Sequence, residues 1–171
     1  MIEKIAGGAV MVAASSGIGY AAAGRFDKRV RELQGLQSGL WLLKNEIHYA
    51  ASPLPEALLR CAGLVPSGIG SLFAAAAKAI QRQKLAGAGF CEALTAEKNK
   101  LHLDSEDYLV LTDFAAGLDS GDTQSQMQNL ENTMQRLKLC EENARENRKK
   151  YGALCRRLGI TAGLFLLIWL L

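Results

Sequence analysis

The distribution of charge along this chain restricts it to a few architectures. No Asp, Glu, Lys or Arg occurs from Ile5 to Gly24 or from Leu158 to Leu171, and nearly all of the 20 basic and 17 acidic residues lie between these stretches. A helix of about 20 residues reaches about 30 Å, the thickness of the bilayer hydrocarbon. The pattern therefore predicts terminal transmembrane segments at residues 1–25 and 158–171, with a middle domain of residues 26–157.

The N-terminal apolar run allows two other interpretations. Lys4 followed by an apolar stretch and Ala21–Ala23 is also typical of a cleaved signal peptide. The segment Ala13–Gly19, Ala-Ala-Ser-Ser-Gly-Ile-Gly, is similar to the phosphate-binding loop of short-chain dehydrogenases, in which glycines let the backbone approach a pyrophosphate. However, alanine occupies the position of the first glycine, and none of the 4 tyrosines is followed four residues later by lysine. A chance match is therefore favoured over an enzyme of that type.

The orientation in the membrane follows from the basic residues. They gather on both sides of the middle domain, at Arg25, Lys28, Arg29 and Arg31 and again at Arg145, Arg148, Lys149, Lys150, Arg156 and Arg157. Because basic residues are retained on the cytoplasmic side, the middle domain is predicted to be cytoplasmic and both termini outside. The run from Leu158 covers only about 21 Å as helix, so partial insertion at the membrane surface is the alternative there.

Helical periodicity runs through the middle domain, and the whole chain contains only 3 prolines, which would interrupt helices. The spacing predicts a helix from Arg25 to about Ala51 with one apolar face, formed by Val30, Leu33, Leu36, Leu40, Leu43, Ile47 and Ala50. The Ser52-Pro53-Leu54-Pro55 segment should end it, with Ser52 as the N-cap of a short helix over 56–61 and Pro53 at its first position.

Four further helices are predicted after this turn. One starts at Val65–Ser67, carries Ile69, Leu72, Phe73, Ala76 and Ile80 on one face, and is ended by Gly87–Gly89; the next spans about Phe90 to Leu101. Asp104 or Ser105 should cap a helix that buries Leu109, Leu111, Phe114 and Leu118. The last begins at Asp122 and carries apolar residues at steps of seven, namely Leu130, Leu137, Ala144, Tyr151 and Leu158. The fold class is therefore an all-α, antiparallel bundle of about six helices.

No catalytic, cofactor-binding or metal-binding constellation is evident. The two histidines, His48 and His102, have no nucleophile or ligand set near them in sequence, and the four cysteines show no CxxC spacing. Asp104, Glu106 and Asp107 fit the acidic first turn of a helix without a metal. A net charge of +3 gives no indication of nucleic-acid binding. The sequence thus favours a protein that is not an enzyme and has no cofactor.

Small residues recur in the two terminal segments. Ala9, Ala13, Gly17 and Ala21 are spaced by four, and Gly159 and Gly163 form a GxxxG pair. Small residues at this spacing allow close helix approach in lipid, so these positions are predicted to be a membrane packing face. The alternative is that Ala and Gly are simply frequent there.

The chain resembles a known family, most clearly in one segment. The run Lys44–Tyr49 followed by Ser52–Leu58 is similar to the signature of the stage III sporulation protein AB family, carried by Glu46, Ile47, Tyr49, Pro53, Leu54, Pro55, Glu56, Ala57 and Leu58. A weaker likeness follows at Leu118–Gln126, where Asp119 and Gly121 depart from the family pattern, and the run from Lys149 to Gly163 resembles the family's closing segment. The resemblance extends over the whole chain.

The resemblance implies a function. It implies a helical domain similar to the F domain of type II secretion and type IV pilus platform proteins. It also implies a scaffold in the mother-cell membrane around the forespore, in a secretion-like complex needed for endospore formation. The implied partners are a cytoplasmic ATPase, other membrane subunits and membrane lipid, with a homo-oligomer as a further option. A general membrane adaptor without a sporulation role is the other function considered.

Overall fold

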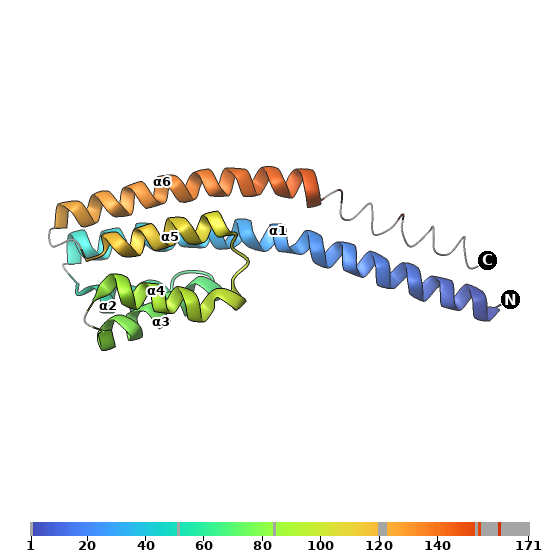
Figure 1. The fold of residues 1–171 in the computed structure, drawn as a ribbon, viewed down its shortest axis with the longest axis horizontal. Helices are drawn as coiled ribbons and strands as arrows, with labels where there is room; N and C mark the ends of the chain where they lie inside the picture. The colour runs from blue at the N-terminus through green and yellow to red at the C-terminus, as the bar shows by residue number, and fades with distance from the viewer. Residues whose placement is uncertain are drawn as a thin grey trace. The chain divides into compact units, whose positions relative to one another are not determined.

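The computed structural model describes residues 2–50, 52–83, 85–119 and 123–152, together with residues 154 and 161. The main elements in these ranges are six α-helices: α1 (Ile2–Ala50), α2 (Leu54–Ala62), α3 (Ser67–Gln83), α4 (Ala86–Glu97), α5 (Ser105–Gly117) and α6 (Thr123–Asn147) (Figure 1). A 3-10 turn, η1 (Lys98–Lys100), follows α4, and a π-helical turn, η2 (Arg148–Gly152), follows α6. The described residues contain no strand, so the predicted all-α fold with about six helices is confirmed.

The chain divides into two compact units. The larger unit comprises residues 29–142, and the described part of the smaller unit comprises residues 2–28, 143–152, 154 and 161. The boundary falls within α1 and within α6, so each of these helices contributes to both units.

Consecutive helices of the larger unit run antiparallel. Ser71 and Ile80 of α3 lie against Glu97 and Gly89 of α4, so the two helices run in opposite directions. In the same way α5 and α6 are antiparallel, because Arg136 reaches Asp113 while the earlier residue Asn129 lies against Gly117. The predicted antiparallel arrangement holds for these neighbours. In contrast, α1 runs parallel to α3, with Gly35 opposite Ile69 and Gly39 opposite Phe73.

Two glycines allow α1 and α3 to approach closely. A methyl group at Gly39 would lie 2.5 Å from Cε2 of Phe73, and one at Gly35 would lie 3.2 Å from Cγ1 of Ile69. The absence of side chains therefore lets the Phe73 ring rest on the backbone of α1. Both Phe73 and Ile69 are fully buried there.

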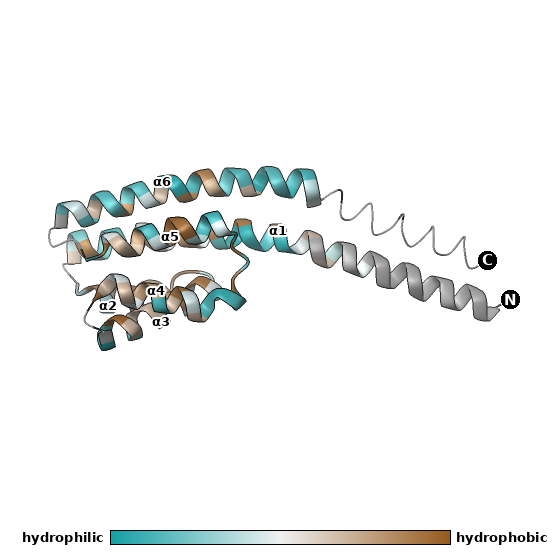
Figure 2. Cartoon of the chain, viewed as in Figure 1, coloured by the Kyte–Doolittle hydropathy of each residue, from teal (hydrophilic) through white to brown (hydrophobic). Residues whose placement is uncertain are grey.

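The hydrophobic core follows the predicted apolar faces. The α1 residues Val30, Leu33, Leu36, Leu40 and Leu43 are buried, and all five residues predicted for the face of α3 are buried as well. Phe90 of α4 and Phe114 of α5 meet edge to face, with ring centroids 5.3 Å apart. Helix α6 is mostly hydrophilic in Figure 2, because only a narrow stripe faces the core, which includes Leu130, Leu137 and Cys140. The prediction was wrong for Ala50, which is exposed at the last residue of α1.

The predicted break at Gly87–Gly89 is also wrong. These glycines lie in the first turn of α4, which begins at Ala86, whereas α3 already ends at Gln83. A methyl group at Gly87 would lie within van der Waals overlap of the Ala115 carbonyl oxygen, and one at Gly89 would lie 2.7 Å from the Ile80 backbone nitrogen. The glycines are therefore present because α4 packs closely on α5 and α3, and they do not interrupt a helix.

Two local predictions at helix ends and faces need correction. Pro53, with φ −55° and ψ 139°, is the N-cap of α2, and Pro55 lies in the first turn. The Ser52 side chain makes no cap; its hydroxyl lies 3.4 Å from a carboxylate oxygen of Glu46. On α5, Leu109 is 58% exposed and Val110 is buried in its place, because the helix presents Val110, Leu111 and Phe114 to the core.

In the smaller unit the end of α6 and the turn η2 contact α1. Phe26 stacks on Tyr151 with ring centroids 6.3 Å apart, and Arg148 lies 3.5 Å from the Asp27 carboxylate. Tyr151 is 41% exposed, but its ring packs on Phe26, in agreement with its predicted place in the apolar row. Leu158, the next residue of that row, lies outside the described residues. Within the described part of the chain, no helix is both long enough and apolar enough to cross a membrane.

Candidate interaction surface

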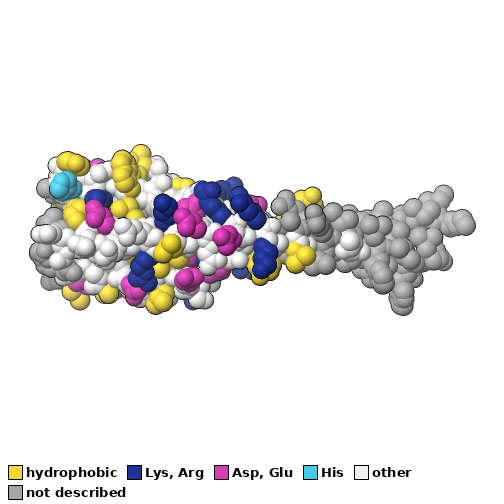
Figure 3. All heavy atoms as spheres, turned by 90° about the horizontal axis from the view of Figure 1, so that it is seen from above, with side chains coloured by type: hydrophobic (Ala, Val, Ile, Leu, Met, Phe, Trp, Pro, Cys, Tyr) yellow, Lys and Arg dark blue, Asp and Glu magenta, His cyan; other side chains and the backbone are white. Residues whose placement is uncertain are grey.

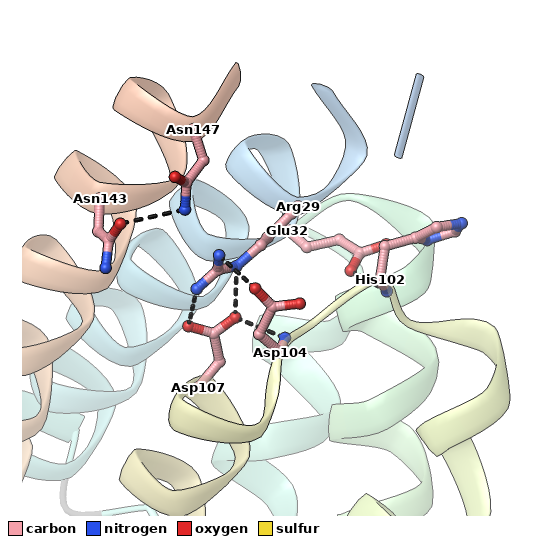
Figure 4. A network of polar contacts seen from close by, with 7 residues as sticks. All are labelled: Arg29, Glu32, His102, Asp104, Asp107, Asn143 and Asn147. Atoms are coloured by element: carbon pink, nitrogen blue, oxygen red, sulfur yellow. Dashed lines mark hydrogen bonds and ion pairs between the residues drawn. The ribbon is translucent and has the colours of Figure 1, made fainter. Parts of the chain in front are cut away.

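A buried ion-pair cluster joins α1 to the start of α5. Arg29 donates from Nε and Nη2 to the two carboxylate oxygens of Asp107, at 2.8 and 2.9 Å, and pairs with Asp104 at 2.5 Å (Figure 4). Asp107 also accepts from the backbone N–H of Asp104, which closes a capping box with Asp104 as the N-cap. Of the two residues predicted as the cap, Asp104 and Ser105, the cap is Asp104. The Asp107 side chain is fully buried, so its charge is compensated by Arg29 and does not form an exposed acidic site.

The charge of this cluster is stable. Burial lowers the pKa of Arg29, but the hydrogen bond and charge of Asp107 and the charge of Asp104 outweigh it, so the pKa lies above its ordinary value. Beside the cluster, Glu32 accepts from the His102 backbone N–H at 2.6 Å and lies 2.9 Å from His102 Nδ1. His102 therefore fixes the loop before α5 to α1, which is a structural role.

Hydrogen bonds to Glu141 join α1 to α6. Glu141 is 8% exposed, and its two carboxylate oxygens accept from Nε2 of Gln34 at 2.8 Å and Nε2 of Gln37 at 2.9 Å. Its hydrogen bonds satisfy a buried carboxylate and fix the two helices at this level.

An apolar groove lies on the outer surface of the larger unit, between α1 and α6. It has a volume of about 620 Å³ and is lined by Gln37, Ser38, Trp41, Leu42, Met134, Gln135 and Lys138. Trp41 is 57% exposed, although its neighbour Leu40 is fully buried. On the face drawn in Figure 3, exposed hydrophobic side chains are interspersed with Lys, Arg, Asp and Glu side chains. Large exposed aromatic groups in a concave apolar surface are typical of protein interaction sites.

The cysteines are not arranged for catalysis. Burial raises the pKa of Cys61 to about 11, and burial together with the charge of Asp107 raises the pKa of Cys140 to about 11. Both thiols therefore stay protonated near neutral pH and are poor nucleophiles. Among the described residues, no group of three or more His, Cys, Asp or Glu side chains could hold a metal ion. Ala13–Gly19, the segment similar to a nucleotide-binding loop, is helical within α1, so it does not form such a loop.

The residues of the predicted signature form the corner between α1 and α2. Ala57 and Leu58 are buried, and Glu46 pairs with Arg60 at 3.0 Å across the corner. Tyr49 is 81% exposed and contacts the His48 ring edge to face. Ile47, Leu54 and Pro55 are partly buried, whereas Pro53 and Glu56 are exposed. Most residues of this signature therefore hold the turn between α1 and α2, whereas Tyr49 is a large side chain of the signature that is exposed to solvent.

The residues predicted to pack in the membrane are only partly described. Gly17 and Ala21 are exposed on α1, and nothing lies within 4 Å of a methyl group placed at Gly17. Ala9 and Ala13 are in α1, with side chains outside the described set, and Gly159 and Gly163 lie outside the described residues. Their role as a packing face remains a prediction.

Sequence reasoning missed the groove. The available signal was Trp41-Leu42, two apolar residues that follow Leu40 and widen the apolar face of α1 beyond one stripe. Their partners on α6, Met134 and Lys138, had no comparable signal, because 92 residues separate Leu42 from Met134 and only the fold brings them together.

Comparisons with known proteins agree with the fold. A family model described as stage III sporulation protein AB matches residues 4–171. A stage III sporulation protein AB of Bacillus subtilis (strain 168) is 26% identical over 169 residues, which cover 98% of this chain and 99% of that protein. A solved structure of a stage III sporulation protein AB has a TM-score of 0.68 at 24% identity and covers 72% of this chain and 98% of its own.

Proposed function

Since the chain belongs to the stage III sporulation protein AB family and has a role in sporulation, we propose that it is a membrane-anchored platform subunit. Its complex would be the secretion-like assembly between mother cell and forespore, and its larger unit would hold a cytoplasmic ATPase at the membrane. The apolar groove with its exposed Trp41 is the observation that carries this proposal, because it offers a docking surface that the fold itself leaves uncovered.

The larger unit has the rigidity that a platform needs. The hydrogen bonds of Glu141 and the Lys44–Glu131 pair join α1 to α6 at separate levels, and the Arg29–Asp107 pair joins α1 to α5. Interfaces built on fixed helices lose little conformational entropy on binding.

The smaller unit supports the proposed membrane attachment. Its described part carries basic residues on both chain segments, namely Arg25 and Lys28 on α1 and Arg145, Arg148, Lys149 and Lys150 at the end of α6 and in η2. Basic residues next to an apolar segment attract anionic lipid headgroups and are retained in the cytoplasm. We therefore keep residues 1–25 and 158–171 as the proposed membrane segments, with the middle domain in the mother-cell cytoplasm.

The proposed function is tested by recruitment. Vesicles that contain the full chain should sediment together with the purified ATPase of the sporulation complex, whereas vesicles without the chain should leave it in the supernatant. Cys91, which is partly exposed, should react with a membrane-impermeant maleimide only after the cells are permeabilised. An ATPase that ignores the chain, with membrane attachment intact, would leave the general membrane adaptor as the better description.

A further inference from the structure

We propose that the groove between α1 and α6 receives an amphipathic helix of a partner protein, whose apolar face packs on Trp41, Leu42 and Met134 and whose Asp or Glu pairs with Lys138. The inference rests on the proposed scaffold function and adds the chemistry of the partner segment. It concerns only the larger unit, in which all lining residues lie.

The shape of the surface fits a helix. Its walls are two antiparallel helices, since Gln34 and Gln37 reach Glu141 at one level and Lys44 reaches Glu131 at 2.5 Å at another. Helix-in-groove recognition uses apolar side chains at positions i, i+3, i+4 and i+7 of the incoming helix, which insert along such a channel. The apolar lining offers few groups to fix a small polar ligand, and the groove is shallow and open to solvent, so the elongated apolar face of a helix fits it better than a small molecule does.

Trp41 is placed as an anchor. It projects from the C-terminal part of α1, between Leu40 and Leu43, which are fully buried, so its backbone is held by the core below. The indole nevertheless stays 57% exposed. Tryptophan on a rigid element is the side chain most enriched at the centre of protein interfaces, because it buries a large area at little entropic cost.

The charge at the rim selects an acidic partner. Lys44 is already paired with Glu131, whereas no carboxylate among the described residues pairs with Lys138, which is exposed on α6 one turn beyond Met134. Gln37, Ser38 and Gln135 complete the rim and carry no charge. Lys138 therefore places beside the apolar floor a positive charge that makes no ion pair with a described residue, and an Asp or Glu next to the apolar stripe of the partner helix would complement it.

The test uses the full chain in nanodiscs of neutral lipid, with empty nanodiscs as reference. The probes are two fluorescent, stapled helical peptides of about 16 residues, long enough for a stable helix, which share one apolar stripe and differ by Glu or Lys beside it. We expect the Glu peptide to bind more tightly than the Lys peptide, and Trp41→Ala to weaken it at least tenfold. Lys138→Glu should reverse the preference of the two peptides.

Two matched variants serve as controls. Lys78→Glu makes the same charge change at an exposed position of α3, and Leu109→Ala removes an exposed apolar side chain of α5; neither should alter binding by more than twofold. Equal binding of both peptides, binding that survives Trp41→Ala, or no binding of either peptide would overturn the inference. Trp41-dependent binding to vesicles of anionic lipid, or Trp41-dependent dimerisation of the chain, would overturn it in favour of a lipid or a second copy as the occupant.

The same variants separate this inference from the proposed function. If the Glu peptide binds as described but the sporulation ATPase does not, the groove has the proposed chemistry and the ATPase is the wrong partner. If the ATPase binds equally well to Trp41→Ala and to the wild type, the platform function stands and this groove is not its docking site.

Discussion

Replacing Asp107 by alanine should destabilise the larger unit strongly, because it leaves a buried guanidinium without its main partner. Asp107 is fully buried and accepts two hydrogen bonds from Arg29 and one from the Asp104 backbone. The Arg29 side chain is only 6% exposed, so water cannot replace the lost carboxylate.

The magnitude follows from these contacts. Removing one partner of a buried ion pair costs about 3–5 kcal/mol, and the lower end applies here because Asp104 still pairs with Arg29. Loss of the capping box at the start of α5 adds up to about 1 kcal/mol. The sum is about 3–4 kcal/mol, which corresponds to a fall of about 6–16 °C in the midpoint of thermal unfolding for a chain of this length.

Thermal unfolding of the full chain, followed by circular dichroism in one detergent, measures this effect. Asp113→Ala is the matched control, because Asp113 also pairs with an arginine, Arg136 at 2.7 Å, but both side chains are about half exposed. That variant should cost less than about 1 kcal/mol. A double variant, Arg29→Met with Asp107→Leu, should recover most of the loss. If Asp107→Ala shifts the midpoint no more than Asp113→Ala does, the cluster does not hold α1 to α5.

Three further predictions use neighbouring or matched positions. Leu58→Asp should lower the free energy of unfolding by about 3 kcal/mol or more, whereas Leu59→Asp should lower it by less than about 1 kcal/mol, because Leu58 is 1% exposed and Leu59 is 44% exposed. Equal midpoints of thermal unfolding for the two variants would contradict the packing of α2. Gly89→Ala should cost about 1–3 kcal/mol by pushing α4 from the Ile80 backbone, while Gly63→Ala, whose nearest neighbour is at 3.8 Å, should be neutral or slightly stabilising in the same unfolding assay. At pH 9, iodoacetamide should modify Cys91 well before Cys61 and Cys140, and mass spectrometry of a Cys155→Ser variant would show this order. Because burial raises the pKa values of Cys61 and Cys140 to about 11, these thiols also contribute stability that is present below pH 9 and is lost as the pH rises to 11.

Helix positions and apolar faces could be read from the sequence because they depend on local periodicity. The face of α3 was predicted residue by residue, from Ile69 to Ile80, and each of these residues is buried. The N-cap was predicted to within one residue, at Asp104 or Ser105, for a similar reason, since capping depends on residues within one turn.

The failures come from contacts between distant segments. Gly87 and Gly89 were predicted to break a helix, and only the proximity of Ala115 and Ile80 shows why they lie within one. Asp107 was correctly predicted in the acidic first turn of a helix, but its burial was not, because its partner Arg29 is 78 residues away. The roles of these glycines and of this buried charge depend on segments that are distant in sequence but close in the fold, and the periodicity of one segment cannot reveal such contacts.

The candidate docking surface was missed for the same reason. Trp41 was visible as a residue beside the apolar stripe of α1, but Met134 and Lys138 join it only after α6 has folded back along α1. The Glu46–Leu58 signature, in contrast, is contiguous and was recognised directly, although the structure shows it mainly as a packed corner.

Spore formation by a Trp41→Ala variant tests the central claim most directly. The variant gene should replace the native copy in its host, with Leu109→Ala as the matched exposed apolar control. The account predicts that Trp41→Ala is present in the membrane fraction at the wild-type level but lowers the yield of heat-resistant spores to that of a deletion strain, whereas Leu109→Ala sporulates normally. A Trp41→Ala strain that forms spores at the wild-type yield would contradict the claim that this groove holds an essential partner.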